Sequence, residues 1–252
     1  MRRRFRSLFL VFTTVAILAG PHAHSAVVVN ETFDGYSDTA AMQVNWGASG
    51  AATLNVGVGN GGNSALHPGG VVNSWIGSAI SLTPTATESI VLSADIFDDG
   101  TSANERLTVG LRNGANPLFE MGHYNGTAEH YHVRVLNMYG GENWTPLSPG
   151  LNANGLVPGW NRFTATFTPT SLTVTLDLGA DGSIEGTFVS NGAASANAFT
   201  DLRFGGPSNL SSAGGSAGFD NISLSTVAVP EPTGLSLLGI AALGLAFRRR
   251  RD

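Results

Sequence analysis

The chain has 252 residues, of which 13 are Lys or Arg and 18 are Asp or Glu, and it contains no cysteine. All 13 basic residues are arginines, and eight of them lie at the two ends. From Val27 to Val229 five arginines face 16 carboxylates, so this body carries 5 − 16 = −11. Nucleic-acid binding needs clustered cations, so we expect no nucleic-acid partner. The missing cysteines exclude disulfides and thiolate metal sites.

The N-terminal 26 residues have the pattern of a secretory signal. Four arginines within positions 2–6 precede the apolar stretch Leu8–Gly20, and small residues suited to cleavage follow Pro21. Cleavage after Ser25 fits better than cleavage after Ala26, because it puts an alanine at the −3 position. The alternative is an uncleaved anchor, but the apolar stretch is short for a span of about 20 residues.

The C-terminus combines a proline-rich junction, an apolar run and a basic end. Gly234–Phe247 gives fourteen apolar-rich residues, or about 21 Å of helix, which is shorter than a hydrocarbon core of about 30 Å. We therefore expect a transient membrane stop whose arginines stay cytoplasmic. The prolines keep the junction extended and accessible to a processing enzyme. The residues that make up this signal are Val229, Pro230, Glu231, Pro232, Arg248, Arg249, Arg250 and Arg251.

This order of features resembles the PEP-CTERM sorting tail of exosortase substrates in Gram-negative bacteria. The resemblance implies an exported protein whose tail inserts transiently into the inner membrane. It implies processing near Pro230–Pro232 by an exosortase-type membrane protease, and a destination at the cell surface or in the extracellular matrix. The alternative is an ordinary C-terminal anchor helix that follows a chance Pro-Glu-Pro.

The middle of the chain predicts an all-β fold. Short alternating or β-rich runs recur between Gly, Asn and Asp turn clusters, and long 3.6-period segments and internal repeats are missing. Many short strands at this spacing are typical of a sandwich. We expect strands at Val27–Phe33, Ala52–Val58, Val71–Ile76, Ser89–Phe97, Arg106–Arg112, Leu118–Tyr124, His130–Met138, Gly159–Thr168, Ser171–Leu178, Ile184–Val189, Asp201–Phe204 and Gly218–Ser225.

Three of these strands predict a meander. Phe163, Ala165 and Phe167 share one face, a Pro-Thr turn follows, and an Asp-Gly turn closes the next strand. This order resembles the laminin-G-like members of the concanavalin A-like domains, and Gly218–Leu224 is similar to their last strand. The resemblance implies a two-sheet antiparallel jelly-roll sandwich over residues 27–225, with the first and last strands adjacent. A signal helix (1–26) and a hydrophobic helix in the sorting tail (226–252) flank it.

The sequence predicts no catalytic site. Jelly-roll glucanases of the laminarinase type carry two Glu and an Asp alternating on one strand, which sets the acid and the nucleophile on one face. The nearest segment here is Glu88–Asp99, where Asp95 stands alone in the strand and two further aspartates fall in a turn. We therefore expect a protein that is not an enzyme, with a hydrolase of unfamiliar site as an unfavoured alternative.

Calcium is the one cofactor that the resemblance suggests. In many jelly-roll binding modules a carboxylate near the first strand and an aspartate in the last strand hold a structural Ca²⁺. The matching residues are Glu31, Asp34 and Asp220, and carboxylate oxygens are suitable calcium ligands. The alternative is a polar pair at a strand edge, without an ion.

Histidines and aromatic residues gather between positions 123 and 144. His130 and His132 are predicted to share one face of a strand, with His123 nearby in the sequence. Such an i, i+2 pair can chelate Zn²⁺, although two histidines on a solvated strand face are commoner. Aromatic rings beside Asn and His suit a carbohydrate site. The alternative is a set of core aromatics with a loop. The predicted ligand-binding residues are Tyr124, His130, His132, Tyr139, Asn143 and Trp144.

The sequence thus predicts an exported, non-catalytic surface or matrix protein that binds polysaccharide through its jelly-roll domain. The main alternative is a purely structural component of an exopolysaccharide matrix with no discrete ligand.

Overall fold

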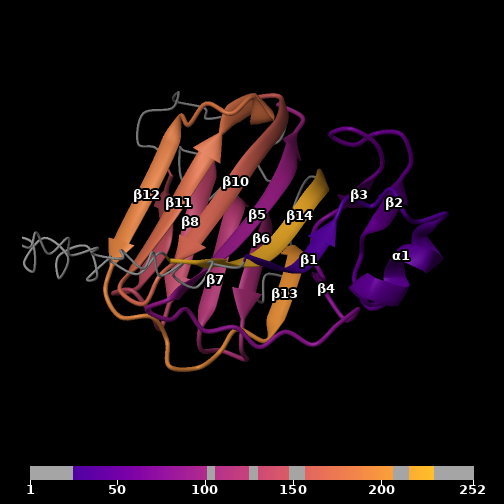
Figure 1. Ribbon diagram of the computed structural model, residues 1–252. Helices are drawn as coiled ribbons and strands as arrows, with labels where there is room; N and C mark the ends of the chain where they lie inside the picture. The colour runs from indigo at the N-terminus through magenta and orange to yellow at the C-terminus, as the bar shows by residue number, and fades with distance from the viewer. Residues whose placement is uncertain (1–24, 101–105, 125–129, 148–156, 207–215, 230–252) are drawn as a thin grey trace, which may run out of the picture.

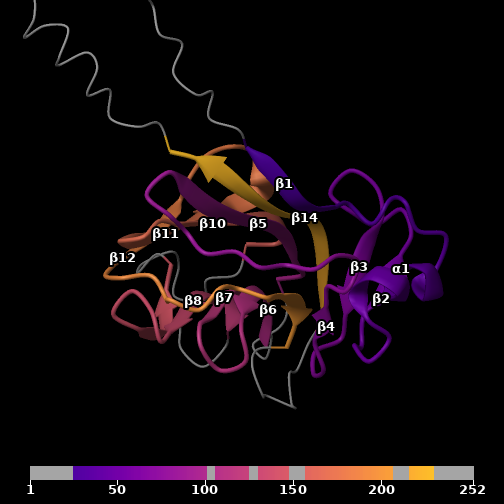
Figure 2. The same ribbon diagram turned by 60° about the horizontal axis from the view of Figure 1, so that its bottom comes forward.

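The computed structural model describes residues 25–100, 106–124, 130–147, 157–206 and 216–229. They form two antiparallel β-sheets packed face to face, with one short helix at the side (Figure 1). Figure 2 shows the two layers, with β1, β14, β5 and β10 to β12 in one and β6 to β8 in the other. The jelly-roll sandwich predicted from the sequence is confirmed. The predicted signal segment up to residue 24 and the tail from residue 230 lie outside the described residues.

The larger sheet has eight strands in the order β12-β11-β10-β5-β14-β3-β2, and β1 also pairs with β14. Its strands are β1 (Ala26–Glu31), β2 (Thr53–Asn55), β3 (Ser64–His67), β5 (Glu88–Asp98), β10 (Gly159–Phe167), β11 (Ser171–Asp177), β12 (Gly186–Asn191) and β14 (Ala217–Ala228). A short 3₁₀ turn, η1 (Leu178–Ala180), follows β11.

The smaller sheet has six strands in the order β4-β13-β6-β7-β8-β9. Its strands are β4 (Asn73–Ser74), β6 (Arg106–Arg112), β7 (Leu118–Tyr124), β8 (Tyr131–Leu136), β9 (Glu142–Pro146) and β13 (Asp201–Gly205).

The core lies between the sheets and follows the two-residue period of the strands. Phe163, Ala165 and Phe167 of β10 are fully buried, as the alternation predicted. Phe119 of β7 meets Phe167 edge-on across the gap, with ring centroids 4.9 Å apart. Each sheet therefore has an inner apolar face and an outer face on which polar residues can lie.

The first and last strands are neighbours, as predicted. β1 pairs with β14 from Ala26–Thr226 to Glu31–Ile222, and β10, β11 and β12 form the predicted meander. Because β1 already begins at Ala26, cleavage after Ser25 leaves this strand whole. β14 continues to Ala228, three residues beyond the predicted end of the domain, so little chain separates the sandwich from Pro230.

The helix α1 (Thr39–Trp46) was not predicted. The Asp38 side chain caps it by accepting the backbone N–H of Ala41, and Met42 and Trp46 are buried. Trp46 packs edge-on against Phe204 of the smaller sheet, with centroids 4.8 Å apart. Eight residues give only two turns, too few for a periodic pattern to stand out in the sequence.

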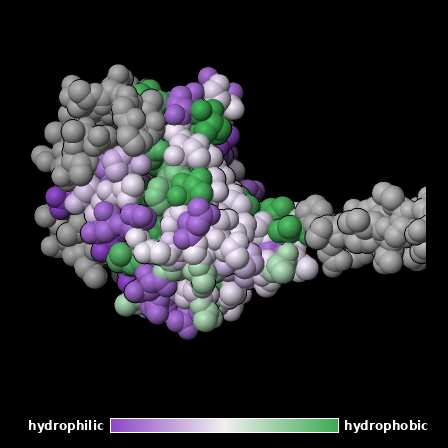
Figure 3. Space-filling model, turned by 90° about the vertical axis from the view of Figure 1, so that its left-hand side faces the viewer, coloured by the Kyte–Doolittle hydropathy of each residue, from purple (hydrophilic) through white to green (hydrophobic). Residues whose placement is uncertain are grey.

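The face of the domain on the β12 side is polar or neutral over much of its described area. Figure 3, which faces the β12 side, shows hydrophobic residues in small separate groups among hydrophilic and neutral ones. In the part of the chain that the structure describes, no helix combines the length and hydropathy needed to cross a membrane.

Candidate functional site

Arginine is concentrated on the outer face of the six-stranded sheet. In β6 the core side chains are Leu107, Val109 and Leu111, so the alternation turns Arg106 and Arg112 outward. The same alternation turns Arg134 of β8 and Arg203 of β13 outward, because their sequence neighbours pack in the core. Four of the five arginines between Val27 and Val229 therefore share one face of an acidic domain.

Glu120 of β7 lies in the middle of these arginines. Its carboxylate accepts Nη1 of Arg134 at 3.4 Å through one oxygen and Nη2 of Arg203 through the other. Arg112 belongs to the same cluster of charges. Burial lowers the pKa of its guanidinium group, and the positive charge of Arg203 lowers it further. Glu120 thus fixes two arginines of this face by charge-assisted hydrogen bonds.

An aromatic pair adjoins the arginines at one end of this face. The rings of Tyr124 and Trp144 stack in parallel with centroids 4.2 Å apart. Arg106 lies over the Tyr124 ring at 5.6 Å, and Arg134 lies over the Trp144 ring at 5.5 Å. Arg134 also donates from Nε to Oδ1 of the exposed Asn143 at 3.1 Å. We call Arg106, Tyr124, Arg134, Asn143 and Trp144 the aromatic–arginine cluster.

A β-bulge sets the position of Trp144. Val133 pairs with Thr145 and Val135 with Glu142, so two residues of β9 lie opposite one residue of β8. Trp144 takes φ = 55°, a left-handed conformation that costs a non-glycine residue about 1–2 kcal/mol. Bulges commonly re-aim a side chain, and this one brings the Trp144 ring onto Tyr124.

Three of the predicted ligand-binding residues, Tyr124, Asn143 and Trp144, lie together in this cluster. His132 is adjacent, since its ring meets Tyr124 edge-on at 5.5 Å, but it is fully buried. His130 instead lies against His123, with centroids 4.8 Å apart.

The placement predicted for Tyr139 is corrected. Tyr139 follows the far end of β8, is 1% exposed and donates its hydroxyl to the Thr168 carbonyl at 2.6 Å. It is a core residue at the opposite end of the sandwich from Tyr124. Burial raises its pKa above the ordinary range of tyrosine.

The arginines of this face were not predicted as site residues. Their sequence signal is the alternation in Arg106–Arg112, where arginine stands at both outward ends of an apolar strand. The alternation places both on one face, but only the sheet order adds Arg134 and Arg203 to it.

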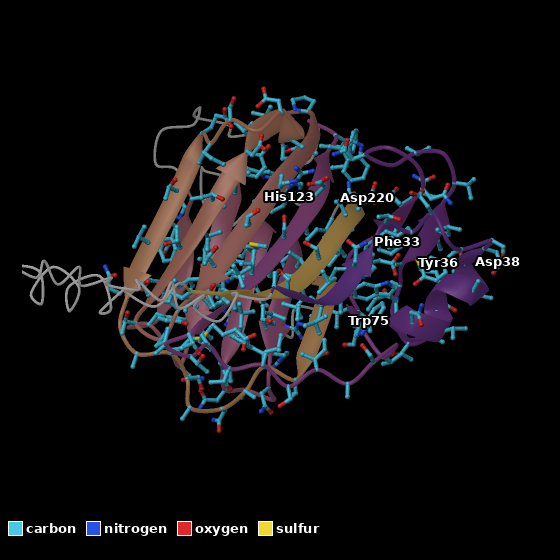
Figure 4. All side chains as sticks on the ribbon, viewed as in Figure 1. Phe33, Tyr36, Asp38, Trp75, His123 and Asp220 are labelled. Carbon is cyan, nitrogen blue, oxygen red and sulfur yellow. The ribbon has the colours of Figure 1, made fainter. Side chains whose placement is uncertain are left out.

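The predicted calcium ligands fall into two groups. Asp34 accepts the N–H of Asn63 at 2.7 Å and Asp220 accepts the N–H of Asn60 at 2.7 Å, so both hold the glycine-rich segment between Gly57 and Asn63. Burial raises the pKa of Asp220 to about 6, and the nearby carboxylates of Asp95 and Asp34 add to this shift. Figure 4 shows Asp220 near the upper end of β14.

Glu31 has different hydrogen-bond partners from these two aspartates. Its oxygens accept the backbone N–H of Phe33, the hydroxyl of Tyr36 and Nε1 of Trp46. The structure therefore assigns Glu31 to the packing of α1, and only Asp34 and Asp220 remain together.

Comparison with known proteins matches residues 228–251 to the PEP-CTERM protein-sorting motif. No curated protein sequence matches the chain significantly. Among solved structures, peanut lectin shares 12% identity, covers 82% of this chain and 100% of its own, and has a TM-score of 0.48. The CBM2 module of the Lactobacillus casei BL23 phage J-1 evolved Dit shares 14%, with 82% and 98% coverage and a TM-score of 0.43.

Domain 4 of AbnA, a GH43 extracellular arabinanase from Geobacillus stearothermophilus, shares 13% identity, with 82% and 95% coverage and a TM-score of 0.44. The sorting motif begins at the last residue of β14, so fold and signal adjoin without a spacer. The chain is an exported, surface-sorted protein whose jelly-roll domain is followed directly by a PEP-CTERM sorting motif.

Proposed function

We propose that this protein is a non-catalytic binder of acidic polysaccharide and that the aromatic–arginine cluster is its binding site. The observation that carries the proposal is Trp144, a large side chain held in a left-handed conformation by a bulge. Backbone strain of this kind persists where the surroundings impose it and is concentrated at functional positions. Packing of the core does not explain it, because Trp144 lies on the outer face and is only partly buried.

The charge of the face favours an acidic ligand. In the part of this face that the structure describes, the four arginines lie with the carboxylates of Glu120 and Asp201, while the sequence from Val27 to Val229 carries −11. A local positive region on an acidic protein steers anions to one place. Guanidinium groups also bind carboxylates in a bidentate geometry, which suits uronic acid residues.

The geometry of the rings favours a sugar that is held at the edge of the stack. Tyr124 and Trp144 cover each other's inner faces, and arginines lie over both rings. A sugar therefore meets ring edges, guanidinium groups and the exposed Asn143 together. Arg134 contacts both the Trp144 ring and Asn143, so this one residue combines a positive charge with an aromatic contact.

Binding without cleavage is part of this proposal. A retaining glycosidase needs two carboxyl groups about 5–5.5 Å apart, one of which must act as a general acid. On this face Glu120 is 1% exposed and both its oxygens accept arginine donors. These contacts favour a carboxylate that positions arginines rather than one that donates a proton to a leaving group.

The sorting motif suggests where the ligand is met. We propose processing near Pro230–Pro232 by an exosortase-type membrane protease of a Gram-negative host, after transient insertion of the tail in the inner membrane. Because β14 ends at Ala228, cleavage there removes no strand. The mature domain then lies at the surface or in the matrix, where it meets the acidic polysaccharide that it binds.

Affinity measurements on the full-length protein test the proposal. We expect Trp144→Ala and Arg134→Gln each to weaken binding of a polyuronate at least about tenfold, which corresponds to about 1.4 kcal/mol. Arg134→Lys keeps the charge and should retain part of the affinity. Ile184→Ala is the matched control, because Ile184 is exposed beside the other sheet. Equal affinity in all four variants would place the binding site outside the cluster, and no binding by the parent would favour the alternative, a structural matrix component without a discrete ligand.

A further inference from the structure

Asp98, His123 and His130 form a second polar group, inside one end of the sandwich. One ligand-capable atom of each lies within 4.8 Å of the others, and all three residues are buried. His130 Nε2 lies 3.7 Å from Asp98 Oδ2, and the two imidazole rings have centroids 4.8 Å apart. Figure 4 shows His123 within the sandwich, far from the aromatic side chains of Phe33 and Trp75 beside α1.

The group joins the two sheets. Asp98 is the last residue of β5 in the larger sheet. His123 lies at the end of β7 in the smaller sheet, and its ring packs toward Phe163 of the larger sheet at 6.3 Å. His130 directly precedes β8. Nothing in the sequence spacing brings these residues together, because the contact depends on how the sheets stack.

The geometry suits a metal ion better than a hydrogen bond. A separation of 3.7 Å is too long for an imidazole–carboxylate hydrogen bond. Two ligands of a tetrahedral zinc with bonds of about 2.0 Å lie about 3.3 Å apart. The three ligand atoms lie within 4.8 Å of one another, so side-chain movements that shorten these separations by up to about 1.5 Å close the site. Two imidazoles with one carboxylate are a ligand set of Zn²⁺ and its first-row neighbours.

The surroundings already orient the carboxylate. The Tyr131 hydroxyl donates to Asp98 Oδ2 at 2.7 Å, and the N–H of Gly100 donates to Asp98 Oδ1 at 2.8 Å. Tyr131 is itself held by Asn161, whose Nδ2 donates to its hydroxyl at 3.2 Å. Supporting hydrogen bonds of this type fix the ligands of metal sites.

We propose that Asp98, His123 and His130 bind a divalent first-row transition metal, with Zn²⁺ as the best-fitting ion. The ion links β5 to β7 and β8 and so fastens one end of the sandwich. A chain without cysteine has no disulfide for this purpose, and a metal that binds only the folded state stabilises it. The site lies inside the domain and is separate from the aromatic–arginine cluster.

Zinc titration of the full-length chain tests this proposal. The histidine pair His22 and His24 near the N-terminus could chelate zinc adventitiously, so all variants carry His22→Ala and His24→Ala. After chelator treatment, we expect uptake of one Zn²⁺ per chain, a higher melting temperature, and visible absorption bands with Co²⁺. Asp98→Asn, His123→Gln and His130→Gln should each weaken zinc binding by about 100-fold or more, since even supporting residues account for 10–100-fold.

His132→Gln is the matched control, because His132 is an equally buried histidine on the same sheet outside the group. It should bind zinc like the parent. Where a variant fails to fold by circular dichroism, X-ray absorption of the zinc-loaded parent decides. A first shell with two imidazoles and a carboxylate oxygen supports the proposal. A different shell, no stoichiometric uptake, or uptake unchanged in the three variants overturns it.

Discussion

Tyr124 and Trp144 stack in parallel at 4.2 Å although β8 separates their two strands. The stack reaches across the intervening strand because the bulge in β9 displaces Trp144 from the regular alternation. Two rings that hold each other in place lose little further freedom when a ligand binds, which favours affinity. The proposed site therefore depends on an irregular backbone as much as on residue type.

The strain at Trp144 predicts a difference between two small substitutions. Trp144→Gly and Trp144→Ala remove the same ring, but glycine adopts φ = 55° without penalty. We expect the glycine variant to be more stable than the alanine variant by about 1 kcal/mol in urea unfolding. At the next residue, Thr145, where φ is not positive, glycine should be the less stable choice. If the glycine variant were the more stable one at Thr145 as well, the difference at Trp144 could not be attributed to backbone strain.

His67 predicts a loss of stability in acid. Its Nε2–H donates to the Val71 carbonyl and its Nδ1 accepts the N–H of Gly69, which fixes a neutral ring. Burial lowers its pKa to about 4 from 6.5. Between these values the unfolded chain binds the proton and the folded chain does not, so stability falls as the pH falls. The loss from this residue should reach about 3 kcal/mol by pH 4.

The His67→Gln variant isolates this contribution. Its free energy of unfolding should be below that of the parent at neutral pH, because the two hydrogen bonds are imperfectly replaced. The difference should shrink or reverse as the pH falls from 6.5 to 4, since glutamine has no proton to bind. Urea unfolding at several pH values measures this, and a pH-independent difference would rule the account out.

The pair of Asp95 and Arg162 should be sensitive to removal of one partner. Asp95 is fully buried and accepts Nε and Nη2 of Arg162 at 2.7 and 2.9 Å. Arg162→Gln leaves a buried charge, which we expect to cost about 2 kcal/mol, below the range for a fully buried pair because Arg162 is 39% exposed. The double variant with Asp95→Asn should recover part of this loss in urea unfolding. Additive losses would show that the two side chains are not coupled.

Calcium at Asp34 and Asp220 stays a proposal with a direct test. If Ca²⁺ binds there, it should raise the melting temperature of the full-length chain, and a calcium chelator should lower it. Asp220→Asn should abolish the shift. Glu31→Gln is the control that should keep the shift, because Glu31 oxygens serve Phe33 and Trp46 instead. If Ca²⁺ does not change the melting temperature of the parent, the proposal is wrong and hydrogen bonds alone hold the segment 57–63.

Much of the sandwich could be predicted from the sequence, because apolar and polar residues alternate along a regular strand. Arg106–Arg112 and Leu118–Tyr124 were predicted to the residue as β6 and β7. The strands β3 and β9 were missed, since β3 has four residues and β9 contains a bulge that breaks the alternation. Patterns with a period of two cannot reveal a strand whose period is interrupted.

The sites were less predictable than the strands. Closeness in sequence placed Tyr139 with Trp144, but Tyr139 lies beyond the end of β8 and its side chain enters the core. The converse holds for Asp98 and His123, which are 25 positions apart and meet only because two sheets stack. The local sequence pattern predicts which face of a strand a residue occupies and how neighbouring strands pair. Contacts between the two sheets depend instead on how the sheets stack in the fold.

Ligand charge and salt provide the most direct test of the central claim, that the outer face of the six-stranded sheet binds acidic polysaccharide. Isothermal titration of the full-length protein should compare a polyuronate with a neutral glucan at low and high ionic strength. We predict that the polyuronate binds, that the neutral glucan binds far more weakly, and that salt weakens the polyuronate complex because it screens exposed charges. Equal affinity for both polymers, or an affinity for polyuronate that salt does not change, would contradict the account.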